Sequence, residues 1–269
     1  MLATKKNEIP PTVGAKLPSE EGSSTETAIE YSIDYLTKHA PCGWEKERER
    51  YLKLLKDYLD HEKPLRMVVL SADIRKSTFL MQESVSFRKF AQLMGRFIDR
   101  TAEDIRNHGG WFDKFTGDGF LAYWLLPGEN PDYSEILTVC ETLLHTFRDT
   151  GMDIFRKNCR NFPAGVGLSL GIDAGDAYMV TMAGDLTIVG PPVVGAVRMV
   201  DAAEKPWETV CNVFLGYALY ENRERLMARD QIEVRREYRK TKEYEEQEVY
   251  PVIFNSRYSA KSQQSAPEP

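Results

Sequence analysis

The segment GGWFDKFTGDGFLAYW, residues 109–124, decides how the fold of this sequence is interpreted. Its two aromatic, apolar runs predict short neighbouring strands, and Gly117 and Gly119 predict a tight turn between them. Asp118 lies at the tightest point of this turn, and Lys114 lies four residues before it. Because a plain hairpin needs neither charge at these positions, we expect this hairpin to take part in function.

Strands and helices alternate along the middle of the chain, residues 64–255. The predicted elements are a buried strand over 66–74, a long helix closed by Gly109 and Gly110, the hairpin, a helix around 136–147, a strand–turn–strand over 165–182, a helix over 192–203, and closing strands over 232–239 and 248–254. The order β-α-β-β-α-β predicts a ferredoxin-like α+β fold, with an antiparallel sheet and helices on one face.

The segments on either side of this domain differ in composition. Residues 1–26 are rich in Pro, Gly, Ser, Thr and Glu, and we expect them and the polar tail 256–269 to be disordered. Residues 27–63 have apolar positions at helical spacing, interrupted near APCGW at 40–44. This helical extension could be a dimerisation element, a regulatory element or a cap on the main domain.

The composition narrows the class of protein. The 269 residues are 42% hydrophobic and carry a net charge of −6, which argues against a nucleic-acid scaffold with a basic surface. No apolar run approaches the ~20 residues that span a bilayer, and the first residues lack the apolar core of a secretory signal. Four scattered cysteines without a CxxC pair are typical of reduced thiols. We therefore expect a cytoplasmic protein.

Two carboxylates are predicted to meet at one edge of the sheet. Asp73 ends the first strand and Asp118 lies in the hairpin turn, and the β-α-β-β order makes these strands neighbours. Two carboxylates and a backbone carbonyl suit Mg²⁺ or Mn²⁺, and the helix start after IRKST, residues 74–78, would favour phosphate oxygens. The alternative is structural, with Asp73 as a helix N-cap and Asp118 as a turn former.

Three segments together resemble the class III nucleotide cyclases. They are VVLSADIRKSTFL at 68–80, GGWFDKFTGDGFLAYW at 109–124 and TIVGPPVVGAVRM at 187–199, and the resemblance extends over about 65–255. It implies a ferredoxin-like catalytic domain that works as a homodimer, with active sites across the subunit interface. It also implies a nucleoside triphosphate substrate and two divalent ions, Mn²⁺ or Mg²⁺, in each active site.

The resemblance assigns a role to individual residues. Asp73, Asp118 and the backbone carbonyl of Ile74 would hold the metal, Ser77 and Thr78 would bind the phosphates, Lys114 would contact the base, Arg198 would stabilise the transition state, and Lys242, or alternatively Lys240, would bind the triphosphate. One subunit would supply the two aspartates and its partner would supply Lys114, Arg198 and Lys242.

Three positions depart from the standard purine cyclases. Val194 stands where the family has an Asn that orients the ribose, and Thr187 stands where adenylyl cyclases have an Asp. Guanylyl cyclases would have Glu in place of Lys114, so GTP is a poor candidate. A lysine only donates hydrogen bonds, whereas a threonine can donate and accept. Asp113 matches no functional position, and we expect it to be an exposed turn or strand-edge carboxylate.

These departures resemble the pyrimidine cyclases of the bacterial Pycsar antiphage defence system. The resemblance implies a second-messenger synthase that makes cyclic UMP from UTP, because donor-only Lys114 and a threonine that both donates and accepts do not demand an amino group. The alternatives are cyclic CMP from CTP, a divergent adenylyl cyclase that makes cyclic AMP, and a cyclase homologue that binds nucleotide without turnover.

Overall fold

The computed structural model describes residues 36–37, 40–61, 63–126, 133–182, 185–203, 211–226, 232–239 and 246–254. The expected disordered segments 1–26 and 256–269 lie outside the described residues, as do Lys240 and Lys242.

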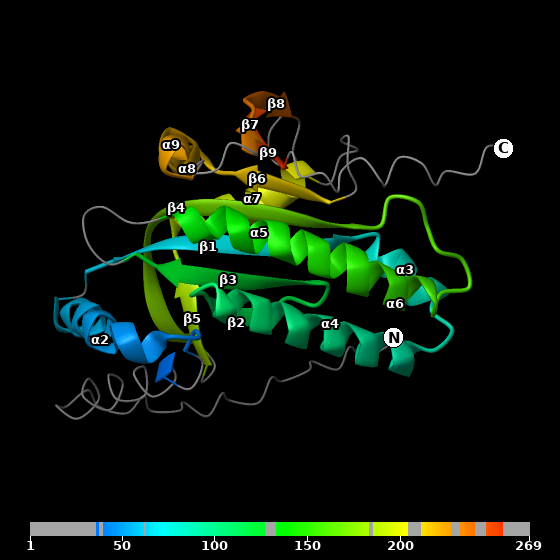
Figure 1. Cartoon of the computed structure of the whole chain (residues 1–269), viewed down its shortest axis with the longest axis horizontal. Helices are drawn as coiled ribbons and strands as arrows, with labels where there is room; N and C mark the ends of the chain where they lie inside the picture. The colour runs from blue at the N-terminus through cyan, green and yellow to red at the C-terminus, as the bar shows by residue number, and fades with distance from the viewer. Residues whose placement is uncertain are drawn as a thin grey trace, which may run out of the picture.

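Four antiparallel strands form the centre of the fold (Figure 1). They are β1 (Leu65–Arg75), β2 (Trp111–Phe115), β3 (Gly119–Leu125) and β4 (Gly167–Met182). Their order across the sheet is β2-β3-β1-β4, so β1 pairs with both β3 and β4. This is the ferredoxin-like arrangement that the element order predicted.

Helices cover one face of this central sheet (Figure 1). They are α3 (Ser77–Glu83), α4 (Phe87–Asn107), α5 (Ser134–Thr146), the π-helical turn η1 (Phe147–Gly151) and α6 (Met152–Arg156). The N–H of Lys89 donates to the hydroxyl of Ser86 and caps the start of α4, while Gly109, with φ of 77°, follows its end. The apolar face of α4 is buried as predicted, except that Phe87 is exposed.

A further helix, α7 (Pro191–Ala203), lies on the opposite face of the sheet. Leu170 and Ile172 of β4 belong to the core under α4 and α5, whereas Gly171 between them faces α7. A Cβ at Gly171 would lie 2.1 Å from the carbonyl oxygen of Ala196, so helix and strand approach backbone to backbone. The prediction of helices on one face therefore holds for α4 and α5 but not for α7.

The remaining strands extend the sheet beyond β4. They are β5 (Asp185–Val189), β6 (Asn212–Leu215), β7 (Ile232–Val234), β8 (Glu237–Arg239) and β9 (Gln247–Phe254), with the short helices α8 (Tyr217–Glu221) and α9 (Arg223–Leu226) after β6. β5 folds back antiparallel on the end of β4, and β6 runs parallel to β4, so the extended sheet is mixed. Among the described strand pairs, the antiparallel prediction thus holds everywhere except between β4 and β6.

Two boundaries differ from the prediction. The predicted strand–turn–strand over 165–182 is instead one continuous strand, in which Gly175 keeps its place opposite Met67 in the ladder with β1. The predicted closing strand over 232–239 is broken at 235–236 into β7 and β8, which both pair with β9.

The helical extension includes α2 (Trp44–His61), which lies at one end of the sheet (Figure 1). Its Trp44 and Tyr58 share a buried cluster with Ala196, so α2 packs on the same face as α7. The ring of Trp44 meets that of Trp111 edge-on, with centroids 5.7 Å apart. The hydroxyl of Tyr58 donates to the carbonyl of Met179 at 2.8 Å and accepts from its N–H at 2.9 Å. The described part of this extension thus covers one end of the domain, and its dimerisation or regulatory role stays a prediction. No helix in the described ranges is long and apolar enough to cross a membrane.

Candidate active site

The two predicted metal-binding aspartates lie at the same edge of the sheet. Asp73, near the end of β1, is directly opposite Gly119 of β3, the residue after Asp118. The N–H of Ile74 donates to the carbonyl of Asp118 at 3.1 Å. The hydroxyl of Ser77 donates to Oδ2 of Asp118 at 2.7 Å. The hairpin turn is therefore fastened to both the end of β1 and the start of α3.

Two glycines allow the turn to come this close to β1. Gly117 has φ of 106°, a left-handed value that side chains rarely adopt. A Cβ at Gly119 would lie 1.9 Å from the carbonyl oxygen of Ala72, so only glycine fits there. On the other side, Lys76 has φ of 64°, and α3 begins at the next residue. A non-glycine residue in this conformation is uncommon and is often found at functional sites.

The structural alternative, in which Asp73 is a helix N-cap and Asp118 a turn former, does not fit Asp73. The residue at the N-cap position of α3 is Lys76, three residues after Asp73, so Asp73 is not the N-cap residue of that helix. Asp118 does occupy the turn, but its carboxylate also accepts a hydrogen bond from Ser77, which is distant in the sequence. Asp118 thus does more than shape a turn.

The chemistry of the site fits a divalent ion that arrives with a substrate. Within the described ranges, no cluster of three or more His, Cys, Asp or Glu side chains could enclose a metal. Asp73, Asp118 and the carbonyl of Ile74 provide two carboxylates and one neutral oxygen. Mg²⁺ is commonly held by one or two carboxylates, with water and substrate phosphates completing its shell. The residues present therefore fit such an ion, but not a permanent all-protein cage.

A second polar cluster joins the same hairpin to β5. It consists of Asp113 and Lys114 of β2 and Thr187 of β5. The hydroxyl of Thr187, in β5, donates to Oδ2 of Asp113 at 3.0 Å, and Nζ of Lys114 lies 3.6 Å from the same oxygen. The backbone of Ile188 also hydrogen-bonds to Asp113. Lys114 and Thr187, the two residues at the predicted base-contacting positions, are thus joined through Asp113, for which the sequence indicated no role.

The expectation that Asp113 is an exposed carboxylate is wrong. Its side chain is only 2% exposed, whereas that of Lys114 is 45% exposed. Burial raises the pKa of Asp113, and Lys114 and the hydrogen bonds from Thr187 and Ile188 offset part of this rise. The pairing register of β2 with β3 shifts between Phe112 and Lys114, which makes Asp113 the extra residue of a β-bulge. This bulge has no signature in the sequence.

Residues of α7 form the third part of the candidate site. Arg198 is half-buried on this helix, and Val194, one turn earlier, is 49% exposed. Val194 thus points its apolar side chain outward where the family would place an asparagine. Lys242, the remaining predicted phosphate-binding residue, lies outside the described residues.

The structure also places a carboxylate beside α7 that the sequence analysis did not single out. Asp173 of β4 lies against two glycines, since a Cβ would come within 1.9 Å of its Oδ2 at Gly195 and within 2.2 Å of its Oδ1 at Gly216. Its Oδ1 accepts a hydrogen bond from the N–H of Ala174 at 2.9 Å. Burial raises the pKa of Asp173 to about 6, and the hydrogen bond from Ala174 offsets part of the rise. The sequence gives only a weak indication of this site: Asp173 follows an apolar strand segment, and glycines occur in elements that come later in the chain.

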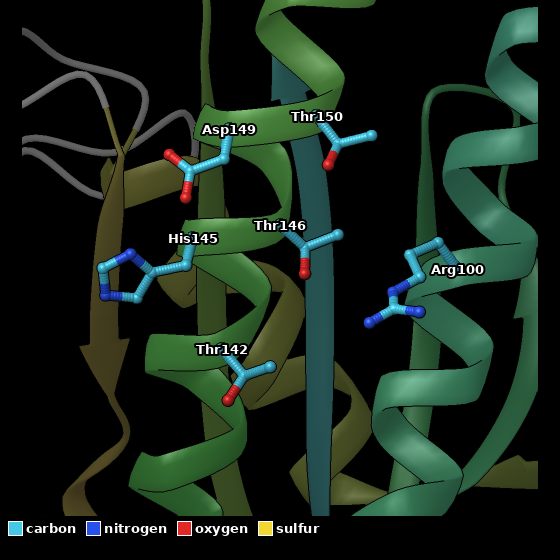
Figure 2. Close-up of a pocket in the computed structure, with 6 residues that line it drawn as sticks. All are labelled: Arg100, Thr142, His145, Thr146, Asp149 and Thr150. Carbon is cyan, nitrogen blue, oxygen red and sulfur yellow. The ribbon is translucent and has the colours of Figure 1, made fainter.

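Two clefts among the described residues of the helical side contain none of the predicted site side chains. A cleft of about 550 Å³ between α4 and α5 is lined by Arg100, Thr142, His145, Thr146, Asp149 and Thr150 (Figure 2). Thr146 donates to Oδ2 of the buried Asp104 at 2.7 Å, and Nε of Arg100 lies 3.5 Å from Oδ1. These polar groups join the two helices. A second, more apolar cavity of about 390 Å³ lies between α3, α4 and the hairpin.

Comparison with known proteins identifies the fold. No family model matches the chain, and no curated protein matches it significantly. Among solved structures, the adenylyl cyclase CyaB from P. aeruginosa matches with a TM-score of 0.58 at 18% identity, covering 72% of this chain and 97% of that one. The guanylyl cyclase Cya2 matches with a TM-score of 0.53 at 16% identity, covering 72% and 96%. The guanylate cyclase domain of RhGC from Catenaria anguillulae, in complex with GTP, matches at 0.55 and 13%, covering 72% and 99%. The chain therefore has the fold of the class III cyclase catalytic domain.

Proposed function

We propose that this chain is a nucleotide cyclase, which converts a nucleoside triphosphate to the 3′,5′-cyclic monophosphate and pyrophosphate. The observation that supports this most is the fastening of the hairpin turn at Asp118 by Ile74 and Ser77. These contacts place Asp118 beside Asp73 at one sheet edge of a cyclase fold. Neither a simple turn nor a helix cap accounts for this arrangement.

In the proposed reaction, the 3′-hydroxyl oxygen forms a bond to the α-phosphorus, the bond from that phosphorus to pyrophosphate breaks, and the hydroxyl proton leaves to water. Asp73, Asp118 and the carbonyl of Ile74 would hold divalent ions, Mn²⁺ or Mg²⁺, two per site. When bound, these ions would lower the pKa of the hydroxyl and neutralise phosphate charge. The hydroxyl of Ser77 is engaged with Asp118, so Ser77 and Thr78 would contact the phosphates through their backbone N–H groups.

The other half of each site would come from a second copy of the chain. Lys114 and Thr187 would contact the base, and Arg198 and Lys242 would offset negative charge that grows on the phosphoryl oxygens. Exposed apolar side chains support an interface on this side of the molecule, because such groups commonly mark association surfaces. They are Tyr178, Met182 and Val189 on β4 and β5, and Val194 and Val197 on α7. A homodimer would then have two equivalent sites.

The proposed substrate is a pyrimidine nucleotide. UTP is the substrate that the sequence predicts, with cyclic UMP as a second messenger in antiphage defence. One contact favours a second candidate: the hydroxyl of Thr187 donates its proton to Asp113, so only its lone pairs remain for a base. An acceptor there suits an amino group, which cytosine carries and uracil lacks. CTP, or ATP in a divergent adenylyl cyclase, is therefore the second candidate.

The proposal is tested by incubating the purified protein with Mn²⁺ and each of ATP, GTP, CTP and UTP, and identifying the products by mass spectrometry. We expect a cyclic pyrimidine monophosphate as the main product. Asp118→Asn should lower turnover at least about 10²-fold while the fold is retained, whereas the exposed Asp153→Asn should be unaffected. Absence of any cyclic product would instead support a binding protein without turnover.

Shared sites are tested by complementation. A mixture of Asp73→Ala and Arg198→Ala chains should regain activity, because one of the two interface sites in each heterodimer would be intact. No recovery, with heterodimers confirmed by differently tagged chains, would refute sites shared between subunits while leaving the cyclase proposal standing.

A further inference from the structure

The bulge in β2 brings two charged neighbours to the same face of the sheet. In a regular strand, Asp113 and Lys114 would point to opposite faces. Here Asp113 is the extra residue, and Lys114 is paired with Leu121, on the face that α2 and α7 cover. Asp113 therefore meets both Thr187 of β5, which lies on this side, and the ammonium of Lys114.

The contacts of Asp113 determine what the hydroxyl of Thr187 can do. An ionised carboxylate only accepts hydrogen bonds, so the single proton of the hydroxyl is committed to Oδ2 of Asp113. The same oxygen lies 3.6 Å from the ammonium of Lys114, which favours the ionised carboxylate and offsets part of the rise in pKa that burial causes. Beyond Asp113, the half-exposed ammonium of Lys114 can donate, and Thr187, which is 6% exposed, has only its lone pairs left to accept.

We propose that Asp113 is a positioning residue that selects the base, by holding Thr187 as an acceptor beside the donor Lys114. This inference rests on the proposed function and decides between its two pyrimidine substrates. Cytosine offers an amino group next to ring and carbonyl acceptors, which matches this pair. Uracil places a carbonyl oxygen where cytosine has the amino group, and that oxygen would face the oxygen of Thr187 with no proton between them. Adenine and guanine differ in the same way, because adenine has an amino group where guanine has a carbonyl oxygen.

The test compares substrates that differ only in this group. The readouts are the ratios of kcat/KM for CTP over UTP and for ATP over GTP, so that ring size cancels within each pair. We expect the wild-type CTP/UTP ratio to be about tenfold or more, the factor that one net hydrogen bond of ~1.4 kcal/mol provides. In Asp113→Asn the hydroxyl of Thr187 is no longer opposite a carboxylate and can turn to donate, so the ratio should fall toward one.

Variants of the partner residue separate this role from a structural one. Thr187→Val removes the acceptor and should lower the ratio, mostly through CTP, whereas Thr187→Ser keeps the hydroxyl and should restore it. A purely structural role for Asp113 would lower turnover on all four nucleotides equally and leave both ratios unchanged. The exposed Asp153→Asn serves as the control that should change neither.

Two results would overturn the inference: a wild-type protein that prefers UTP to CTP, or an unchanged ratio in folded Asp113→Asn and Thr187→Val. Failure of the cyclase proposal is recognised separately, because then the wild type forms no cyclic product. In that case, the ratio of Kd values for CTP and UTP by isothermal titration calorimetry tests the same selection. Thermal melting by circular dichroism establishes that each variant is folded.

Discussion

Asp173 should destabilise the folded protein at neutral pH, and removing its charge should relieve this cost. Burial between Gly195 and Gly216 raises its pKa from 3.8 to about 6. A raised pKa means that the folded state holds the proton more tightly, so the stability that this group contributes is present at low pH. It is lost as the pH rises from about 4 through 6. At ~1.36 kcal/mol per pH unit, the loss above pH 7 is about 3 kcal/mol.

Asp173→Asn has nearly the same shape and cannot ionise, so it should fit between the same glycines. We expect its free energy of unfolding to exceed that of the wild type by about 3 kcal/mol at pH 8, falling to about 1 kcal/mol at pH 4.5. Urea unfolding at several pH values measures this difference, and Asp176→Asn, exposed on the same strand, is the matched control. The reasoning fails if Asp173→Asn gains nothing at pH 8, or gains equally at both pH values.

Three further predictions, with four substitutions, test the packing of the fold by urea unfolding. Gly119→Ala should lower the free energy of unfolding by at least ~2 kcal/mol, because its Cβ would meet the backbone carbonyl of Ala72 in β1. Gly95→Ala, in open space on α4, should instead raise it by up to ~1 kcal/mol. Equal effects of the two substitutions would contradict this reasoning. Thr146→Val should cost about 1–3 kcal/mol, because the buried carboxylate of Asp104 loses its hydroxyl donor, and a neutral result would contradict that contact. Tyr58→Phe should cost about 1–2 kcal/mol and speed hydrogen exchange in α2, since both hydrogen bonds to β4 are lost; unchanged exchange would show that α2 is held without them.

The central fold was predictable because its signals are local. The apolar run of β1, the turn glycines of the hairpin and the helical periodicity before Gly109 each specify one element, and their order specifies the ferredoxin-like core. The errors arose where tertiary packing overrides a local signal. Gly175 is typical of a turn, yet it continues β4 because it pairs with Met67 in the unbroken ladder with β1. The place of α7 on the second face likewise depends on Gly171, whose purpose only packing reveals.

The candidate site was predictable in its first part and not in its second. Asp73 and Asp118 could be placed together because strand order alone brings the end of β1 to the hairpin turn, and the register confirms that placement. Their roles, like those of Arg198 and Lys114, stay predictions. Asp173 was missed because its burial depends on two glycines that are distant from it in the sequence. They are Gly195 on α7 and Gly216 after β6.

Asp113 shows most clearly why sequence alone was insufficient. Asp113 was expected to be exposed because it matches no functional position of the family, and regular strand alternation would also point it away from the face of Lys114. One inserted residue reverses that conclusion, because a bulge puts both side chains on the same face. The two carboxylates of the hairpin therefore lie in different places. Asp118 is in the turn and accepts a hydrogen bond from Ser77 at the start of α3, whereas buried Asp113 faces β5 and accepts one from Thr187. If the base is selected as proposed, substrate choice would depend on a residue that need not touch the substrate.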